Sequence, residues 1–360
     1  MNFLLKLPLI LAITLALQSL FRFPAVFLLN LLRCTAATLT IQTAVALPSV
    51  LWFRSELLYD VSGALCFVVV AGLSLGLSTT GDTTFLRGLS PGLWREVPVV
   101  MMRGGGGWRA LGVDWRQGVV SLAVCVWAGR LGIYTFRRTL HKGGDSRFDF
   151  IRYNPKRFFS VFMLQALWVT MCTLPVVALN SVPFEAFEGV AWQSGGGDPV
   201  VLVPSIMRMF WFWLGAWSIF RGFMIECVAD WQMAKWAKEK EQKKHDEVFC
   251  GKGLWYRSRH PNYYGECLIW LGFAMVCSSV VMASSARKAM GLGFMTGLVL
   301  CYLSPYFVYK LVRNISIPII ENKYDALYMT RTDYRKWRRS RTFRLWMDSD
   351  PQGIRWNSWI

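Results

Sequence analysis

Residues 158–180 read FFSVFMLQALWVTMCTLPVVALN and contain no charged side chain. A helix that crosses the hydrocarbon core of a bilayer needs about 20 mainly apolar residues, and this run is long enough. Seven or eight such runs follow one another along the chain. The sequence therefore predicts an all-α fold, a polytopic membrane helix bundle with seven to eight transmembrane helices. The runs are 3–20, 35–53, 58–79, 118–136, 158–180, 203–225, 263–283 and 290–312.

The first run, residues 3–20, has two interpretations. A cleaved signal peptide would end at a cleavage site of small residues. The apolar pattern instead continues past Arg22 and Pro24 without such a site. We therefore favour one retained anchor in residues 1–30 over a cleaved signal.

The composition also favours a membrane protein. Hydrophobic residues make up 54% of the 360 residues and charged residues only 17%, a balance that is rare in soluble domains. The net charge of +18 has two possible explanations: basic loops on the cytosolic face of the membrane, or a site for an anionic ligand. Nucleic acid is a poor candidate, because the basic residues flank apolar spans instead of covering a soluble domain. The nine cysteines form no CxxC pair, so we expect neither disulfides nor a metal site.

The loop charges predict an orientation. Loop 137–157 has seven Lys and Arg against two acids, loop 228–261 has eight against five, and tail 309–360 has eleven against five. Loop 181–202 has no basic residue and three acids. Basic loops stay in the cytosol, so we expect the three basic segments there and loop 181–202 on the far side.

The stretch 253–266, GLWYRSRHPNYYGE, carries the strongest signal for a site. Pro261 suits the first turn of a helix, and the free backbone N–H groups of that turn favour an anion. Arg257 and Arg259 add positive charge at the same place. The alternative is that both arginines only anchor the helix at lipid headgroups.

Asn262 and Glu266 follow four residues apart, so they share one helix face just inside the membrane. A carboxylate at that depth is costly unless it has a partner, which makes it a candidate functional group. Glu226 and Asp230 have the same spacing at the end of an earlier run, where like charges repel unless a cation or ligand compensates. The alternative for Glu226 and Asp230 is an exposed helix end.

Two further groups of charged residues have plain alternatives. Arg130 ends the run 118–136 and needs an acidic partner or a cavity, unless it reaches the headgroups along its own stem. Segments 321–324 and 333–339 follow the last run and are rich in charge. Basic residues in that position often bind anionic lipids.

In this order, the motifs resemble the steroid 5α-reductase C-terminal superfamily, in its uncharacterised membrane reductase-like branch. The resemblance covers about residues 118–345, and the string from Ser258 to Glu266 is its most specific part. The shared motifs are Gly129-Arg130-Leu131-Gly132, Arg147-Phe148-Asp149, Gln165-Ala166-Leu167-Trp168, Glu226-x-x-x-Asp230-x-Gln232, and Gly253-Leu254-Trp255 continuing to Glu266.

The resemblance implies an NADPH-dependent enzyme of the endoplasmic reticulum that reduces a carbon–carbon double bond in a steroid, sterol or fatty chain. Asn262 and Glu266 match a pair that binds the nicotinamide end of NADPH. Asp230 matches an acid at the ribose–adenine region. The phosphate contacts expected from the resemblance are Arg257, Arg259 and His260. Tyr324 and Arg335 fall in the C-terminal segment that closes over the cofactor.

The chain departs from the family at one point. Steroid 5α-reductases hold the steroid ketone with an adjacent Gln–Glu pair in an early helix, and no such pair precedes residue 118. Isoprenylcysteine carboxyl methyltransferases share Arg-His-Pro-x-Tyr-x-Gly, but they use S-adenosylmethionine and a Glu–Glu pair. Here Asn322 follows Glu321, and the pair of Asn262 and Glu266 favours the reductase.

The sequence thus predicts a variable membrane region 1–117, a reductase-like domain 118–345 and a tail 346–360. A lipid substrate would enter from the bilayer, and Tyr263, Tyr264 or Tyr256 would donate the proton. Glu266 is a further candidate catalytic residue. A methyltransferase and a non-catalytic lipid-binding relative remain the alternatives. Nothing in the sequence indicates an oligomeric state.

Overall fold

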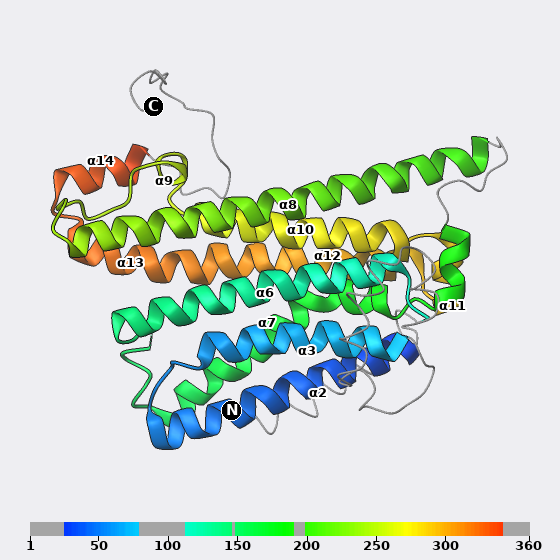
Figure 1. Ribbon diagram of the computed structural model, residues 1–360, viewed down its shortest axis with the longest axis horizontal. Coiled ribbons are helices and arrows are strands. Elements are labelled where there is room, and N and C mark those ends of the chain that lie inside the picture. The colour runs from blue at the N-terminus through cyan, green and yellow to red at the C-terminus, as the bar shows by residue number, and fades with distance from the viewer. Residues whose placement is uncertain (1–24, 79–111, 146–147, 191–198, 341–360) are drawn as a thin grey trace. The chain divides into compact units, whose positions relative to one another are not determined.

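The computed structural model describes residues 25–78, 112–145, 148–190 and 199–340 (Figure 1). Of this part, 83% is helical and none is in a strand, and seven of its helices are long and apolar enough to cross a membrane. The expected all-α membrane bundle is confirmed, while the run 3–20 lies outside the described residues. The seven spans are Ala25–Phe53, Tyr59–Gly76, Trp115–His141, Pro155–Asn180, Pro204–Glu241, Pro261–Val281 and Phe294–Tyr328.

The spans consist of long helices, two of which continue through a π-helical turn. The long helices are α2 (Ala25–Pro48), α3 (Tyr59–Ser78), α6 (Trp115–Lys142), α7 (Pro155–Asn180), α8 (Pro199–Glu241), α10 (Pro261–Val281) and α12 (Phe294–Leu311). The short helices are α9 (Leu254–Arg257), α11 (Ser284–Met290), α13 (Ile317–Tyr328) and α14 (Thr332–Ser340). The π turns are Ser49–Phe53 and Val312–Ser316, and a 3₁₀ helix covers Phe184–Val190.

Local capping sets where two of these helices begin. The Asp114 side chain accepts the backbone N–H of Arg116, and Gln117 bonds back to the Asp114 N–H, which makes a capping box at α6. At α7 the Asn154 side chain accepts the backbone N–H of Arg157, and Pro155 occupies the first turn. These caps satisfy backbone groups that have no partner within the helix.

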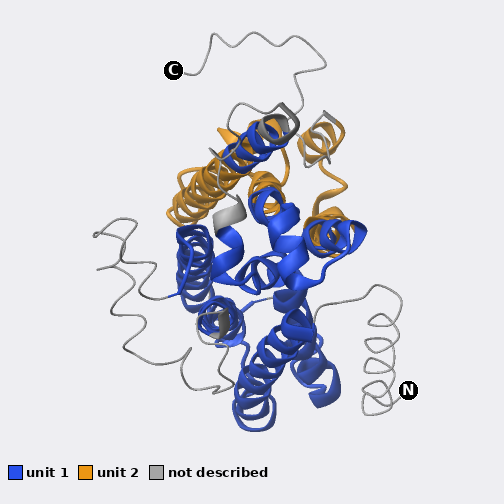
Figure 2. Ribbon diagram, turned by 90° about the vertical axis from the view of Figure 1, so that its right-hand side faces the viewer, with its two compact units in different colours: residues 1–213, 273–304 blue, residues 214–272, 305–360 orange. Residues whose placement is uncertain are grey.

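The chain divides into two compact units (Figure 2). The first unit comprises residues 1–213 and 273–304, and the second comprises 214–272 and 305–360. In the first unit, α3 packs against α6, α2 and α7. The predicted domain boundaries at residues 117 and 345 come from the extent of the family resemblance, and they stay a prediction.

Buried polar side chains join the helices of the first unit. Asn180 at the end of α7 donates to the hydroxyls of Ser74 on α3 (2.8 Å) and Ser121 on α6 (3.0 Å). Gln117 donates to the carbonyls of Leu179 and Val182, both at 3.1 Å. A membrane interior offers no water to such groups, so their mutual bonds fix the helix ends.

Glu56 joins the turn before α3 to the loop between α6 and α7. It is only 5% exposed, and its Oε1 accepts the backbone N–H of Asp145 (2.7 Å) and a guanidinium N–H of Arg152 (2.6 Å). We predict that Glu56→Ala lowers the free energy of unfolding by about 2 kcal/mol, because two bonds to a charged acceptor are lost. Thermal unfolding in detergent measures this.

Asp149→Asn is the matched control. Asp149 lies 3.7 Å from the same Arg152, but its side chain is 56% exposed. An exposed ion pair contributes about 0–1 kcal/mol. Equal losses for the two variants would contradict a bridging role for Glu56.

Candidate functional site

Glycines bring α8 and α10 into backbone contact within the second unit. A Cβ on Gly265 would lie 2.7 Å from the carbonyl oxygen of Gly222, and one on Gly272 would lie 2.6 Å from that of Gly215. Ser218 donates to the carbonyl of Leu268 across the same contact at 3.1 Å. Small residues that let backbones approach are the usual means of packing helices in membranes.

This contact places two acids of α8 near Glu266 of α10. Glu226 and Asp230 on α8 are buried, at 4% and 6% exposure. The interpretation of this pair as an exposed helix end is therefore wrong, because α8 continues past Asp230 to Glu241 and both side chains are buried. Both carboxylates interact electrostatically with Glu266 of α10. Three carboxylates in one region repel one another unless donors compensate their charge.

Asn262 lies one turn before Glu266 on α10. Its Oδ1 is buried and has no hydrogen-bond partner in the described part of the chain. A buried acceptor without a donor costs about 1–3 kcal/mol. The buried Asn262 Oδ1 and the partly buried carboxyl group of Glu266 therefore offer oxygen acceptors one turn apart, which suits a ligand with N–H or O–H groups.

Gln232 holds the start of the stretch 253–266 against α8. Its Oε1 accepts the backbone N–H of Leu254 at 3.0 Å, and its side chain lies where a Cβ on Gly253 would be. Gly253 has φ of +60°, which disfavours other residues as well. Trp255 donates its indole N–H to the carbonyl of Ala229 at 3.0 Å. Gly253 thus lets the Gln232 side chain approach the backbone closely.

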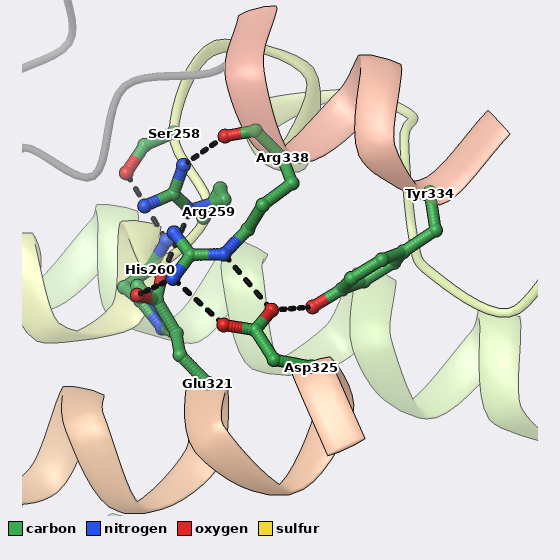
Figure 3. Close-up of polar contacts among 7 residues, drawn as sticks. All are labelled: Ser258, Arg259, His260, Glu321, Asp325, Tyr334 and Arg338. Carbon is green, nitrogen blue, oxygen red and sulfur yellow. Dashed lines mark hydrogen bonds and ion pairs between the residues drawn. The ribbon is translucent and has the colours of Figure 1, made fainter. Parts of the chain in front are cut away.

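Glu321 of α13 is the centre of a buried ion network (Figure 3). Its Oε1 accepts from Nε of Arg259 at 2.8 Å and from Nε2 of His260 at 2.9 Å. Its Oε2 lies 3.1 Å from a guanidinium nitrogen of Arg338 on α14. One carboxylate therefore ties the segment before α10 to both C-terminal helices.

Asp325 extends the network by one helical turn (Figure 3). It accepts two parallel bonds from the Arg338 guanidinium, both at 3.0 Å, and a third from the Tyr334 hydroxyl at 2.7 Å. Arg259 also donates to the backbone carbonyl of Arg338 at 2.8 Å. These bonds hold α14 onto α13 and onto the start of α10.

The network sets the protonation of its members. Burial lowers the pKa of His260 below its ordinary value, so the imidazole is neutral at pH 7 and carries its proton on Nε2 toward Glu321. Burial also lowers the pKa of Arg259, and Glu321 opposes that shift; the guanidinium stays charged. The bond to Asp325 raises the pKa of Arg338.

The predicted start of α10 at Pro261 is confirmed. Arg257 is exposed, whereas Arg259 and His260 are buried and bonded to Glu321. The structure thus brings Arg259 and His260 together, but on an acid of the chain itself. Their assignment to phosphate contacts remains a prediction.

The other predicted residues are spread over three helices. Tyr264 is buried, and Tyr263 stacks on the His260 ring at 5.8 Å between centroids. Tyr324 on α13 is 40% exposed, and Arg335 on α14 is exposed. Both lie in the C-terminal segment that the resemblance implies.

Sequence reasoning did not single out Asp325 or Arg338 as members of a site. Arg338 falls in a basic segment that resembles a lipid-binding tail, and Asp325 follows the charged group 321–324 by one residue. The only available signal was their density of charge. Within the described residues, no group of three or more His, Cys, Asp or Glu is arranged to hold a metal ion.

Comparison with known proteins gives a family and no closer relative. The family described as "Protein of unknown function (DUF1295)" matches residues 93–341, more than two thirds of the chain. Neither the curated proteins nor the solved structures contain a match. The matched region includes α6 to α14 and therefore every residue of the acid pair and the Glu321 network. The chain belongs to the DUF1295 family of steroid 5α-reductase-like membrane proteins.

Proposed function

We propose that the protein is a membrane-embedded reductase that uses NADPH to reduce a carbon–carbon double bond in a lipid. NADPH supplies the hydride when bound. The residues of the chain bind and orient the nicotinamide and provide the proton. The acceptor lipid is a steroid, sterol or fatty chain that reaches the enzyme from the bilayer.

The buried Oδ1 of Asn262 carries this proposal. A nicotinamide ring has a carboxamide whose NH₂ group offers two hydrogens. Asn262 and Glu266 offer acceptors one helical turn apart on α10. A donor at this place satisfies the buried amide oxygen and lowers the repulsion among the three carboxylates.

The anionic part of NADPH is matched by the cytosolic boundary of α10. The first turn begins at Pro261, so its backbone N–H groups favour phosphate. Arg257 and Arg335 are exposed, and we assign them to further phosphate contacts. Because Glu321 compensates the charge of Arg259, we assign Arg259 and His260 the task of fixing this turn. Asp230 remains the candidate for a sugar hydroxyl.

Tyr263 and Tyr264 are the candidate proton donors on α10. A phenol can donate a proton to the carbon next to the one that receives hydride. Tyr263 stacks on a neutral His260, which fixes the plane of its ring. Tyr264 is buried and lies on the turn that also carries Glu266.

Ligand-induced thermal stabilisation tests the cofactor. We predict that NADPH at about 100 times its dissociation constant stabilises the purified protein by roughly 2.7 kcal/mol, and that S-adenosylmethionine does not. Asn262→Ala and Glu266→Gln should each remove the effect of NADPH.

The control for this experiment is Asn322→Ala, which changes an exposed asparagine on α13. It should keep the full NADPH response. Stabilisation by S-adenosylmethionine instead would favour the methyltransferase, and no response to either ligand would favour a non-catalytic lipid-binding protein. Full NADPH affinity in Asn262→Ala would place the cofactor elsewhere.

The location follows from the same proposal. We place the protein in the endoplasmic reticulum, with the basic segments 137–157, 228–261 and 309–360 in the cytosol, where NADPH is available. A cysteine introduced at Lys244, in the exposed loop after α8, should react with a membrane-impermeant maleimide from the cytosolic side only.

A further inference from the structure

A cavity of about 50 Å³ lies among α3, α6 and α7 in the first unit. Three polar side chains line it: Asp60 on α3, Thr135 on α6 and Gln165 on α7. The cavity lies among helices that are otherwise largely apolar. Asp60 lies in the first turn of α3, so its carboxylate sits at the end of this span.

Three aromatic rings form part of the apolar wall. Phe67 meets Trp127 edge to face with 5.1 Å between centroids, and it meets Trp168 in the same way at 5.0 Å. Trp127 is fully buried, so this wall is fixed in place by packing. Because the rings are closely packed, the wall does not move inward to fill the cavity.

Trp168 adds a fourth polar group to the residues that line the cavity, its indole N–H. It lines the cavity, and its Nε1 is buried without a hydrogen-bond partner in the described part of the chain. An indole nitrogen is a donor only, so an acceptor oxygen is what it lacks. Buried polar groups are nearly always paired, so an acceptor oxygen of a ligand would complete the bonding of this indole.

Asp60 decides which kind of oxygen fits. Its carboxylate lines the same cavity and disfavours a phosphate or a fatty-acid carboxylate there by charge repulsion. A hydroxyl oxygen accepts the Trp168 hydrogen and donates its own hydrogen to a carboxylate. A ketone oxygen only accepts, so it could bond to the Trp168 N–H but not to the Asp60 carboxylate.

The size of the cavity limits how much of a ligand enters. A water molecule needs about 10–15 Å³ of such volume, so the cavity holds a hydroxyl and the carbon that bears it, but not a ring system. Asp60, Leu131 and Trp168 are only partly buried, which leaves the cavity unsealed. The apolar remainder of the ligand therefore stays outside the cavity.

We propose that this cavity binds the hydroxyl end of a neutral lipid alcohol through Trp168 and Asp60. Gly132, Gln165 and Trp168 belong to two sequence motifs that the NADPH site leaves without a role. Gly63 supports the arrangement, because a Cβ at this position would collide with the Gln165 side chain. The site makes no use of NADPH, so it and the cofactor site can fail separately.

Photolabelling of the full-length protein in lipid nanodiscs tests the site. The probe is a long-chain alcohol with a diazirine near the hydroxyl and a terminal alkyne. Comparison probes end the same chain in a methyl group or in a carboxylate. We expect the alcohol to label lining peptides of α3, α6 or α7, and both comparison probes to label them about three- to ten-fold less, as for one lost hydrogen bond.

Trp168→Phe keeps an aromatic ring and removes the indole N–H. It should weaken labelling by the alcohol by a similar factor and leave labelling by the methyl-ended probe unchanged. The matched control is Trp217→Phe, at an exposed tryptophan of α8. Equal labelling by the alcohol and the methyl-ended probe in the wild-type protein would overturn the proposal, as would undiminished alcohol labelling in a folded Trp168→Phe.

Discussion

Glu321→Ala is expected to lower the free energy of unfolding by about 3–5 kcal/mol, because it removes the acid that compensates a buried charge. The Arg259 side chain is 2% exposed and Glu321 is its ion-pair partner at 2.8 Å. His260 and Arg338 lose the same acceptor. Thermal unfolding of the purified protein measures the loss, and proteolysis should show α14 released first.

Asp333→Asn provides the comparison for this prediction. Asp333 pairs with Arg331 at 2.8 Å, but both side chains are about half exposed. Exposed pairs contribute about 0–1 kcal/mol, so this variant should unfold almost as the wild type does. If Glu321→Ala were as stable as Asp333→Asn, the network would not hold the C-terminal helices.

Gly265→Ala is expected to cost about 1–3 kcal/mol and to weaken NADPH binding at the same time. The added Cβ would lie 2.7 Å from the Gly222 carbonyl oxygen and 2.9 Å from the Glu226 backbone nitrogen. Neither backbone atom can rotate away, so α8 and α10 must separate. Because Glu226 lies on α8 and Glu266 on α10, these two side chains move apart as well.

Gly129→Ala is the same substitution, but we expect it to raise the free energy of unfolding instead of lowering it. A Cβ on Gly129 of α6 would meet nothing within 4 Å. Alanine is preferred to glycine inside a helix by about 0.5–1 kcal/mol, so this variant should be slightly more stable than the wild type. A loss of stability at Gly129 that equals the loss at Gly265 would show that glycine content, and not the α8–α10 contact, sets the effect.

The spans were largely predictable, because a long apolar run that crosses lipid must satisfy its backbone hydrogen bonds within a helix. Residues 158–180 appear as α7, which begins at Pro155. Boundaries were less predictable where polar residues continue a helix. The run 203–225 is the apolar part of α8, which extends to Glu241 through a segment rich in Lys and Glu. The span predicted at 35–53 begins at Ala25, because α2 continues through Arg33.

Pairings across the chain were beyond the sequence. Arg259 and Glu321 are 62 residues apart, and no local spacing tells which acid meets which arginine. The charge density near Arg259 suggested an anion, and the anion found there belongs to α13. The spacing of Asn262 and Glu266, by contrast, depends only on helix geometry and was predictable. That the Oδ1 of Asn262 is buried without a partner follows from the folded structure and not from the spacing.

Transfer of deuterium from NADPH to a lipid tests the central claim most directly. Proteoliposomes would contain lipids from cells that lack the protein, together with NADPH deuterated at the transferable position of its nicotinamide. We predict that one lipid gains a deuterium on carbon and loses a double bond, and that Asn262→Ala abolishes this gain. A protein that binds NADPH yet leaves every lipid free of deuterium, or that instead transfers a labelled methyl group from S-adenosylmethionine, would contradict the account.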